Sequence, residues 1–229
     1  MMYYPFDSTF LLLIPALIFS MWAQYKVKHT YAVYSEVRAK RGVTADQVCR
    51  DLLDRAGLSG VRIERIAGQL TDHYDPRDKV LRLSDAVSGN PSIAAIGVAA
   101  HECGHAIQDK EGYAFLRFRN AIVPVVNFSS MLSMPIFFIG LLMSSLNLLN
   151  LGIILFLGVL VFHLVTLPVE LDASSRALKM LSDTGMLVGD EINGAKSVLS
   201  AAAMTYVAAL VMTIVQLVRL LALRGSRRN

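Results

Sequence analysis

The pattern of hydrophobic positions divides the chain into long apolar runs and a polar central segment. Residues 121–169 and 198–218 contain no Asp, Glu, Lys or Arg. A helix that crosses a bilayer needs about 20 predominantly apolar residues, so the first run is long enough for two spans. Its middle carries four small polar residues, Ser144, Ser145, Asn147 and Asn150. We therefore predict a helical hairpin with spans near 121–143 and 150–169, and a last span from about 198 to 220.

A further apolar run, TFLLLIPALIFSMWAQY, occupies residues 9–25 and ends in aromatic residues. Its length is at the short limit of about 17 residues for a membrane span, and a cleaved signal peptide is the alternative. The preceding MMYYPFD contains an acidic residue and no basic one, whereas a signal peptide begins with positive charge. The pattern favours a retained first transmembrane helix, which makes four spans in all.

Between the first span and the hairpin, the chain carries signals for helices and short strands. Thr44 and Gln47 form a capping box before a helical apolar stripe that Gly57 ends. QLTDHYD and KVLRLSD are predicted strands joined by a turn over residues 75–78. Asn90 and Pro91 are the expected N-cap and first position of the next helix.

The composition is that of a membrane protein with one water-exposed segment. Hydrophobic residues make up 54% of the chain and charged residues 17%, against roughly a quarter charged in soluble domains. We divide the chain into five parts: the first transmembrane helix (1–25), a polar domain (26–119), the transmembrane hairpin (120–169), a polar helical segment (170–197), and the last transmembrane helix with a basic tail (198–229).

Basic residues near the ends of the spans indicate the orientation, because they gather on the cytoplasmic side. Those that follow the first span, precede the second or follow the third are Lys26, Lys28, Arg38, Lys40, Arg41, Arg117, Arg119, Arg176 and Lys179. They share one side of the membrane if the N-terminus is outside, so the polar domain is predicted to face the cytoplasm. The tail disagrees, because four spans place its four arginines outside: Arg219, Arg224, Arg227 and Arg228.

The polar domain contains AAHECGHAIQ, in which His101, Glu102 and His105 form an H-E-x-x-H motif. Each helical residue advances about 100°, so the two histidines lie about 40° apart on one face and can bind one zinc ion. Glu102 lies beside them and can act as a general base on zinc-activated water. Cys103 points away, and a helix with two surface histidines is the structural alternative.

A catalytic zinc ion takes three protein ligands and leaves one position open, so a third ligand must come from elsewhere in the chain. His29, His73 and His163 are the remaining histidines. Glu170, in LPVELDASSRA, is the best acidic candidate, because its helix should continue from the third span. His163 lies inside that span, where a neutral imidazole bonded to a neighbouring helix is the simpler interpretation.

The segments AAHECGHAIQ, VELDASSRA and DHYDPRDKVLRLS together resemble the YugP-like neutral zinc metallopeptidases over almost the whole chain. More distantly the chain is similar to the HtpX-type membrane gluzincins. The resemblance implies a mainly α membrane protein with a gluzincin-like α+β metalloprotease domain and a small β-hairpin or sheet. It implies Zn²⁺ bound by His101, His105 and Glu170, with Glu102 as general base in peptide hydrolysis.

One position departs from the HtpX-type pattern, because Ser174 stands where that family has an aspartate. Asp172 is the alternative, although it lies on another face of the helix. His73, Tyr74 and Arg176 are candidate donors to the developing oxyanion. The strand KVLRLS could offer its edge to an extended peptide substrate, or be a purely structural strand.

Two other functions remain open: an intramembrane metalloprotease, and a zinc-stabilised membrane scaffold without turnover. The apolar run before His101 is too short to cross a bilayer, which disfavours the first. The predicted partners are membrane lipids and a peptide or membrane-protein substrate, without nucleic acid, in a bacterial plasma membrane. Cys49 and Cys103 lack metal-type spacing and are expected to be free thiols. The oligomeric state is left open.

Overall fold

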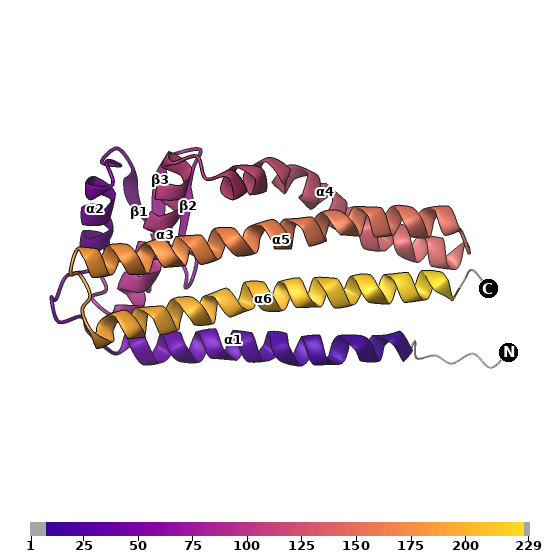
Figure 1. Cartoon of the computed structure of the whole chain (residues 1–229), viewed down its shortest axis with the longest axis horizontal. Coiled ribbons are helices and arrows are strands. Elements are labelled where there is room, and N and C mark those ends of the chain that lie inside the picture. The colour runs from indigo at the N-terminus through magenta and orange to yellow at the C-terminus, as the bar shows by residue number, and fades with distance from the viewer. Residues whose placement is uncertain (1–7, 227–229) are drawn as a thin grey trace. The chain divides into compact units, whose positions relative to one another are not determined.

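The structure is a computed structural model that describes residues 8–226 of the 229-residue chain. It is mainly α-helical with a small three-stranded sheet, as predicted (Figure 1). Two parts of the chain used in the sequence predictions lie outside the described residues. They are residues 1–7, which bear on the signal-peptide alternative, and Arg227 and Arg228, which bear on the orientation.

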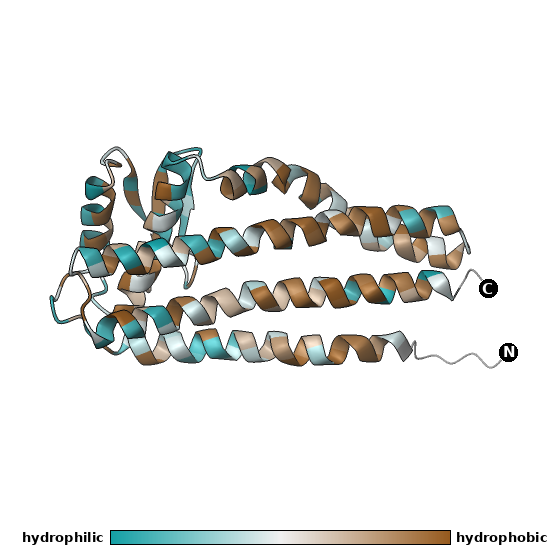
Figure 2. Cartoon of the chain, in the orientation of Figure 1, coloured by the Kyte–Doolittle hydropathy of each residue, from teal (hydrophilic) through white to brown (hydrophobic). Residues whose placement is uncertain are grey.

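Four helices among the described residues are long and apolar enough to cross a membrane: Thr9–Ser35, Ala114–Leu142, Leu146–Asp183 and Asp190–Gly225. The first comprises the short 3-10 helix η1 (Ser8–Leu12) and α1 (Leu13–Ser35); the others are α4, α5 and α6. Figure 2 shows hydrophobic residues along much of α4, α5 and α6. The prediction of four helices long and apolar enough to span a membrane is confirmed, but each helix continues beyond its predicted span into polar sequence.

The chain forms two compact units. Among the described residues, the first comprises residues 8–24, Phe118–Leu167 and residues 205–226. In this unit, Phe137 of α4, Leu149 of α5 and Leu220 of α6 belong to one buried cluster. A Cβ atom at Gly152 would lie 2.8 Å from the Cβ of Phe137, so this glycine allows α4 and α5 to pack closely. This unit therefore contains the predicted hairpin.

The second unit comprises Tyr25–Arg117 and Pro168–Met204. It holds α2 (Ala45–Arg55), α3 (Ile93–Lys110), the sheet, and one end each of α1, α5 and α6. The capping box of Thr44 and Gln47 is present as predicted, and Gly57 follows α2 with a φ of 67°. A core of α2, β3, α3, α5 and α6 side chains surrounds fully buried Leu53 and Ile96. This core fixes α3, the helix that carries the H-E-x-x-H motif.

The sheet has the order β1-β3-β2, which differs from the prediction in two ways. The strands are β1 (Arg62–Ile66), β2 (His73–Asp75) and β3 (Val80–Ser84). β2 and β3 form the predicted antiparallel hairpin, whereas β1, parallel to β3, was not predicted. Of the two alternatives for KVLRLS, the free edge is wrong, because β3 is the central strand. Its partner in the hairpin, β2, is an outer strand.

The start of α3 also differs from the prediction. Ser92, rather than Asn90, is the N-cap, and its hydroxyl accepts a hydrogen bond from the Ala95 amide. Residues 91–93 pair with residues 37–39 through two backbone hydrogen bonds, Ala39 to Pro91 and Ile93 to Val37. This pairing keeps the chain extended past Pro91, and the Asn90 side chain accepts from the Ser92 amide. The helix therefore begins two residues later.

The backbones of α3 and α5 lie very close together at Gly104. A Cβ atom at this position would lie 2.6 Å from the carbonyl oxygen of Ala173 and 3.2 Å from its Cα. Contacts below 3.0 Å to backbone cannot be relieved by a side-chain rotation, so any larger residue separates the helices. Gly104 thus allows the face of α3 that bears His101 and His105 to pack close to α5.

We expect Gly104→Ala to destabilise the fold by about 1–3 kcal/mol, the usual cost of overpacking a tight contact. It should also weaken metal binding, because α5 must move away from α3. Thermal unfolding and zinc titration of the purified protein measure both effects. Gly60→Ala is the matched control, since a Cβ there meets nothing within 4 Å. Wild-type stability in Gly104→Ala would contradict the close packing.

Candidate metal centre

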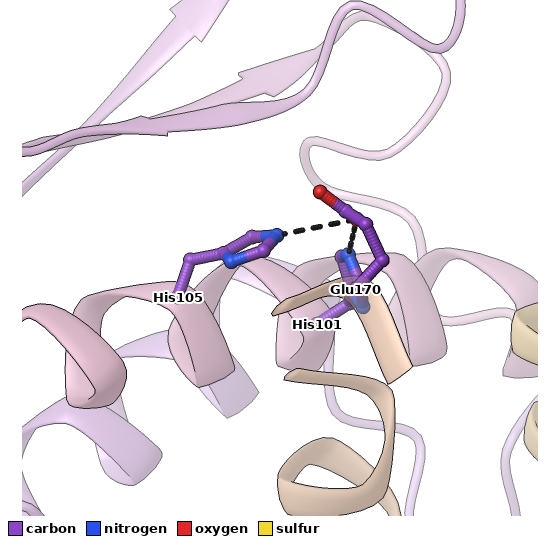
Figure 3. A group of neighbouring side chains, drawn as sticks. All are labelled: His101, His105 and Glu170. Atoms are coloured by element: carbon purple, nitrogen blue, oxygen red, sulfur yellow. Dashed lines mark hydrogen bonds and ion pairs between the residues drawn. The ribbon is translucent and has the colours of Figure 1, made fainter. Parts of the chain in front are cut away.

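Three side chains with metal-binding atoms meet between α3 and α5, within the second unit. His101 and His105 lie on one face of α3, and Glu170 comes from α5 (Figure 3). One ligand atom from each residue lies within 4.8 Å of the other two. The structure thus brings together the three residues that the sequence analysis selected as ligands.

The spacing of these atoms fits a shared metal ion. Glu170 Oε2 lies 3.2 Å from His101 Nε2 and 3.5 Å from His105 Nε2. Ligand atoms about 2.0–2.1 Å from a tetrahedral zinc ion are separated by roughly 3.3 Å. Two imidazoles and one carboxylate are also a ligand set of catalytic zinc sites, which keep a fourth position open. The group is therefore suited to hold zinc.

Glu102 lies beside this group without belonging to it. Its side chain is 7% exposed, and its Oε2 accepts a hydrogen bond of 3.0 Å from the backbone amide of Tyr74 on β2. This amide therefore holds the carboxylate in place. Within residues 8–226, the carboxylate forms no hydrogen bond or ion pair with a cationic side chain. Glu102 is thus a buried carboxylate next to a group suited to hold a metal.

The ring nitrogens of the two histidines that face away from Glu170 have different partners. His101 Nδ1 lies 3.1 Å from the hydroxyl of Ser174, on α5. His105 Nδ1 lies 3.0 Å from Oε1 of Gln108, one turn further along α3. Ser174, which stands where the HtpX-type pattern has an aspartate, thus contacts His101, while Asp172 contacts Gln108.

Comparison with known proteins connects this geometry with one family. A family model described as "Putative neutral zinc metallopeptidase" matches residues 9–225. The chain belongs to this family. It is also 48% identical to the "Putative membrane protease YugP" of Bacillus subtilis (strain 168) over 220 residues, which are 95% of this chain and 98% of that protein. No solved structure matches the chain.

Zinc is accordingly the metal of this metallopeptidase family, and His101, His105 and Glu170 are a group that can hold it. Together with the four apolar helices, the match to a membrane protease supports a membrane protein. The resemblance to the YugP-like family, carried by three short segments of the sequence, is therefore confirmed.

Burial, hydrogen bonds and neighbouring charges shift the pKa of two side chains at or near the metal-binding group. Burial lowers the pKa of the His105 imidazole, but its hydrogen bond to Glu170 and the charge of Glu102 outweigh burial, so this pKa lies above its ordinary value. Burial, followed by a hydrogen bond to Asp109, raises the pKa of the Tyr74 phenol. The phenol therefore stays protonated and donates to Asp109 Oδ2 at 2.8 Å.

Several other candidates lie outside the metal group. The His73 ring contacts the Thr71 carbonyl and Arg82, on the side of β2 opposite to Tyr74. Arg176 is paired with Asp172 and Glu111. His163 lies in the first unit, where it lines a cavity of about 270 Å³ and forms none of the hydrogen bonds found among residues 8–226. The predicted bond from His163 to a neighbouring helix is therefore not observed in that range.

The two cysteines are free thiols and face each other away from the metal group. Cys103 Sγ lies 2.9 Å from Cys49 Sγ, where α3 packs against α2. Both side chains are fully buried. Burial, and then the contact with Cys103, raises the pKa of the Cys49 thiol well above its ordinary value. Cys103 thus serves the core, as its position on the helix indicated.

Proposed function

We propose that the protein is a zinc-dependent endopeptidase of gluzincin type that hydrolyses peptide bonds at the cytoplasmic face of a bacterial plasma membrane. In this proposal His101, His105 and Glu170 bind zinc, and Glu102 is the general base. The observation that carries the proposal is the meeting of two imidazoles from α3 with one carboxylate from α5 at the spacing of metal ligands.

We propose that Glu102 is the group that transfers the proton. When bound, zinc lowers the pKa of a coordinated water and polarises a substrate carbonyl. Glu102 accepts the proton of the attacking water and delivers it to the leaving amine. The Tyr74 amide keeps this buried carboxylate in position.

The edge strand β2 supplies a place for an extended peptide. The Tyr74 amide points toward Glu102 rather than toward β3, so the outer edge of β2 runs past the proposed base. An extended substrate can lie along such an edge. We propose that peptides or exposed segments of membrane proteins bind here, with the surrounding lipids as the second partner.

Substitution of His101 by alanine should abolish stoichiometric zinc binding, because the two remaining ligands, His105 and Glu170, bind zinc too weakly to retain it. Metal analysis of the purified protein in detergent should give about one zinc per chain for the wild type and far less for His101→Ala. His29→Ala is the matched control, since His29 stacks on Tyr25 of α1. Full zinc content in His101→Ala would refute the assignment of this ligand.

A further inference from the structure

Gln108 is a polar side chain with no exposed surface, and the proposed chemistry does not use it. Its amide makes three hydrogen bonds. Oε1 pairs with His105 Nδ1 at 3.0 Å, while Nε2 donates to the carbonyl oxygen of Val169 and to Asp172 Oδ2, both at 2.8 Å. Because both the oxygen and the nitrogen of this buried amide are hydrogen-bonded, it fixes the positions of the groups that it contacts.

These partners determine which proton His105 carries. The Val169 carbonyl can only accept, so the NH₂ group of Gln108 must face it, and Oε1 must face His105. Because Oε1 can only accept, the proton of a neutral His105 lies on Nδ1. The lone pair is then on Nε2, the atom that lies 3.5 Å from Glu170 Oε2. Gln108 thus selects the tautomer that can bind a metal.

The same amide also holds the third ligand. Val169 immediately precedes Glu170, and Asp172 follows it by two residues, so the two bonds from Nε2 lie on either side of Glu170 in the chain. Gln108 therefore couples the position of Glu170 on α5 to that of His105 on α3.

Two ion pairs of Arg176 support this arrangement. Arg176 binds Asp172 Oδ2 through Nε and Glu111 Oε2 through Nη1, each at 2.6 Å. Glu111 is the C-cap of α3, so Arg176 and Gln108 each connect α3 to α5. Asp172 is thereby oriented to accept from Gln108, and the bond from Gln108 to this carboxylate is charge-assisted.

We propose that Gln108 is the positioning residue of the zinc site, which fixes the His105 tautomer and holds Glu170 within reach of both histidines. This inference rests on the proposed zinc ligands. Partners of metal-binding histidines typically contribute 10–100-fold to metal affinity, because they orient the ring and increase its basicity.

The test compares Gln108→Leu with the matched control Gln216→Leu, which replaces a glutamine of α6 in the first unit. Zinc affinity is measured by chelator competition in detergent, and the unfolding temperature is measured on zinc-free protein. Gln108→Leu should weaken zinc binding by about 10–100-fold, and Gln216→Leu should leave it unchanged. The visible absorption of bound Co²⁺ should shift in Gln108→Leu alone, because the orientation of His105 changes.

The outcomes separate this inference from the zinc site itself. If the wild type binds no zinc, the ligand assignment fails. If the wild type binds zinc and Gln108→Leu binds it equally well, the positioning role is overturned. A large fall in the unfolding temperature of the zinc-free Gln108→Leu protein, with an unchanged Co²⁺ spectrum, would also overturn it, because the role would then be structural.

A second variant keeps the test decisive if Gln108→Leu does not fold. Asp172→Asn retains the size of the side chain and an oxygen that accepts from Gln108, but removes the charge. Asp172 is partly exposed, with 30% of its side-chain surface accessible, so this change is tolerated more easily. Zinc affinity should fall about tenfold, the lower end for such partners, and an unchanged affinity would contradict the coupling.

Discussion

Glu102→Gln should keep one zinc ion per chain and lose peptidase activity by a factor of about 10²–10⁴, the usual contribution of general acid–base catalysis. Glutamine has nearly the same shape as glutamate, and its amide oxygen can still accept the hydrogen bond from Tyr74. What it lacks is a basic oxygen that can take a proton. Activity on a peptide substrate and metal content, measured on the same preparation, test this expectation.

The matched control is Glu36→Gln, an exposed glutamate that follows α1. It should leave both zinc content and activity unchanged. Undiminished activity in Glu102→Gln would place the base elsewhere or trace the activity to a contaminant. Absence of peptidase activity from a zinc-loaded wild type would favour the alternative of a zinc-stabilised scaffold.

The intramembrane alternative is less well supported than a site at the membrane surface. The H-E-x-x-H motif lies on α3, which is not among the four apolar helices found in residues 8–226. α3 also ends in Asp109 and Lys110, and it packs against the charged helix α2 and the sheet. Its surroundings are those of a small folded domain.

The parts of the site that could be predicted from the sequence are those with a local signal. His101 and His105 are one helical turn apart, and this spacing alone places them on one face. Glu170 was found because an apolar span predicts a continuous helix, and α5 is indeed unbroken through Pro168. Thr44 and Gln47 were equally clear, because a capping box involves residues only three positions apart.

The features that were missed or misplaced depend on tertiary contacts. Gln108 is one polar residue in a polar run, and only the packing of α5 shows that its amide is buried between His105 and Val169. β1 carries a weak alternation and forms only because it pairs with β3, a contact between segments separated in sequence. The N-cap of α3 is Ser92 rather than the predicted Asn90, because residues 37–39 pair with the segment before α3.

The last prediction concerns the side of the membrane on which Glu170 lies. α5 is a single helix of 38 residues from Leu146 to Asp183. At 1.5 Å per residue it is roughly 57 Å long, well above the hydrocarbon thickness of about 30 Å. If its apolar part crosses the bilayer, Ser145 before it and Ser182 near its end must lie on opposite sides. Because basic residues gather on the cytoplasmic side, Arg176 and Lys179 predict that the end of α5 lies in the cytoplasm.

A cysteine at Ser145 should therefore react with a membrane-impermeant maleimide in intact cells, whereas a cysteine at the exposed position Ser182 should react only after permeabilisation. The background needs Cys49→Ala and Cys103→Ala, which remove the two native thiols from the core. Reaction at Ser182 alone would reverse the orientation and place the proposed zinc site outside the cytoplasm. Equal reaction of both positions in intact cells would refute the crossing of α5, and with it the membrane hairpin that delivers Glu170 to the two histidines.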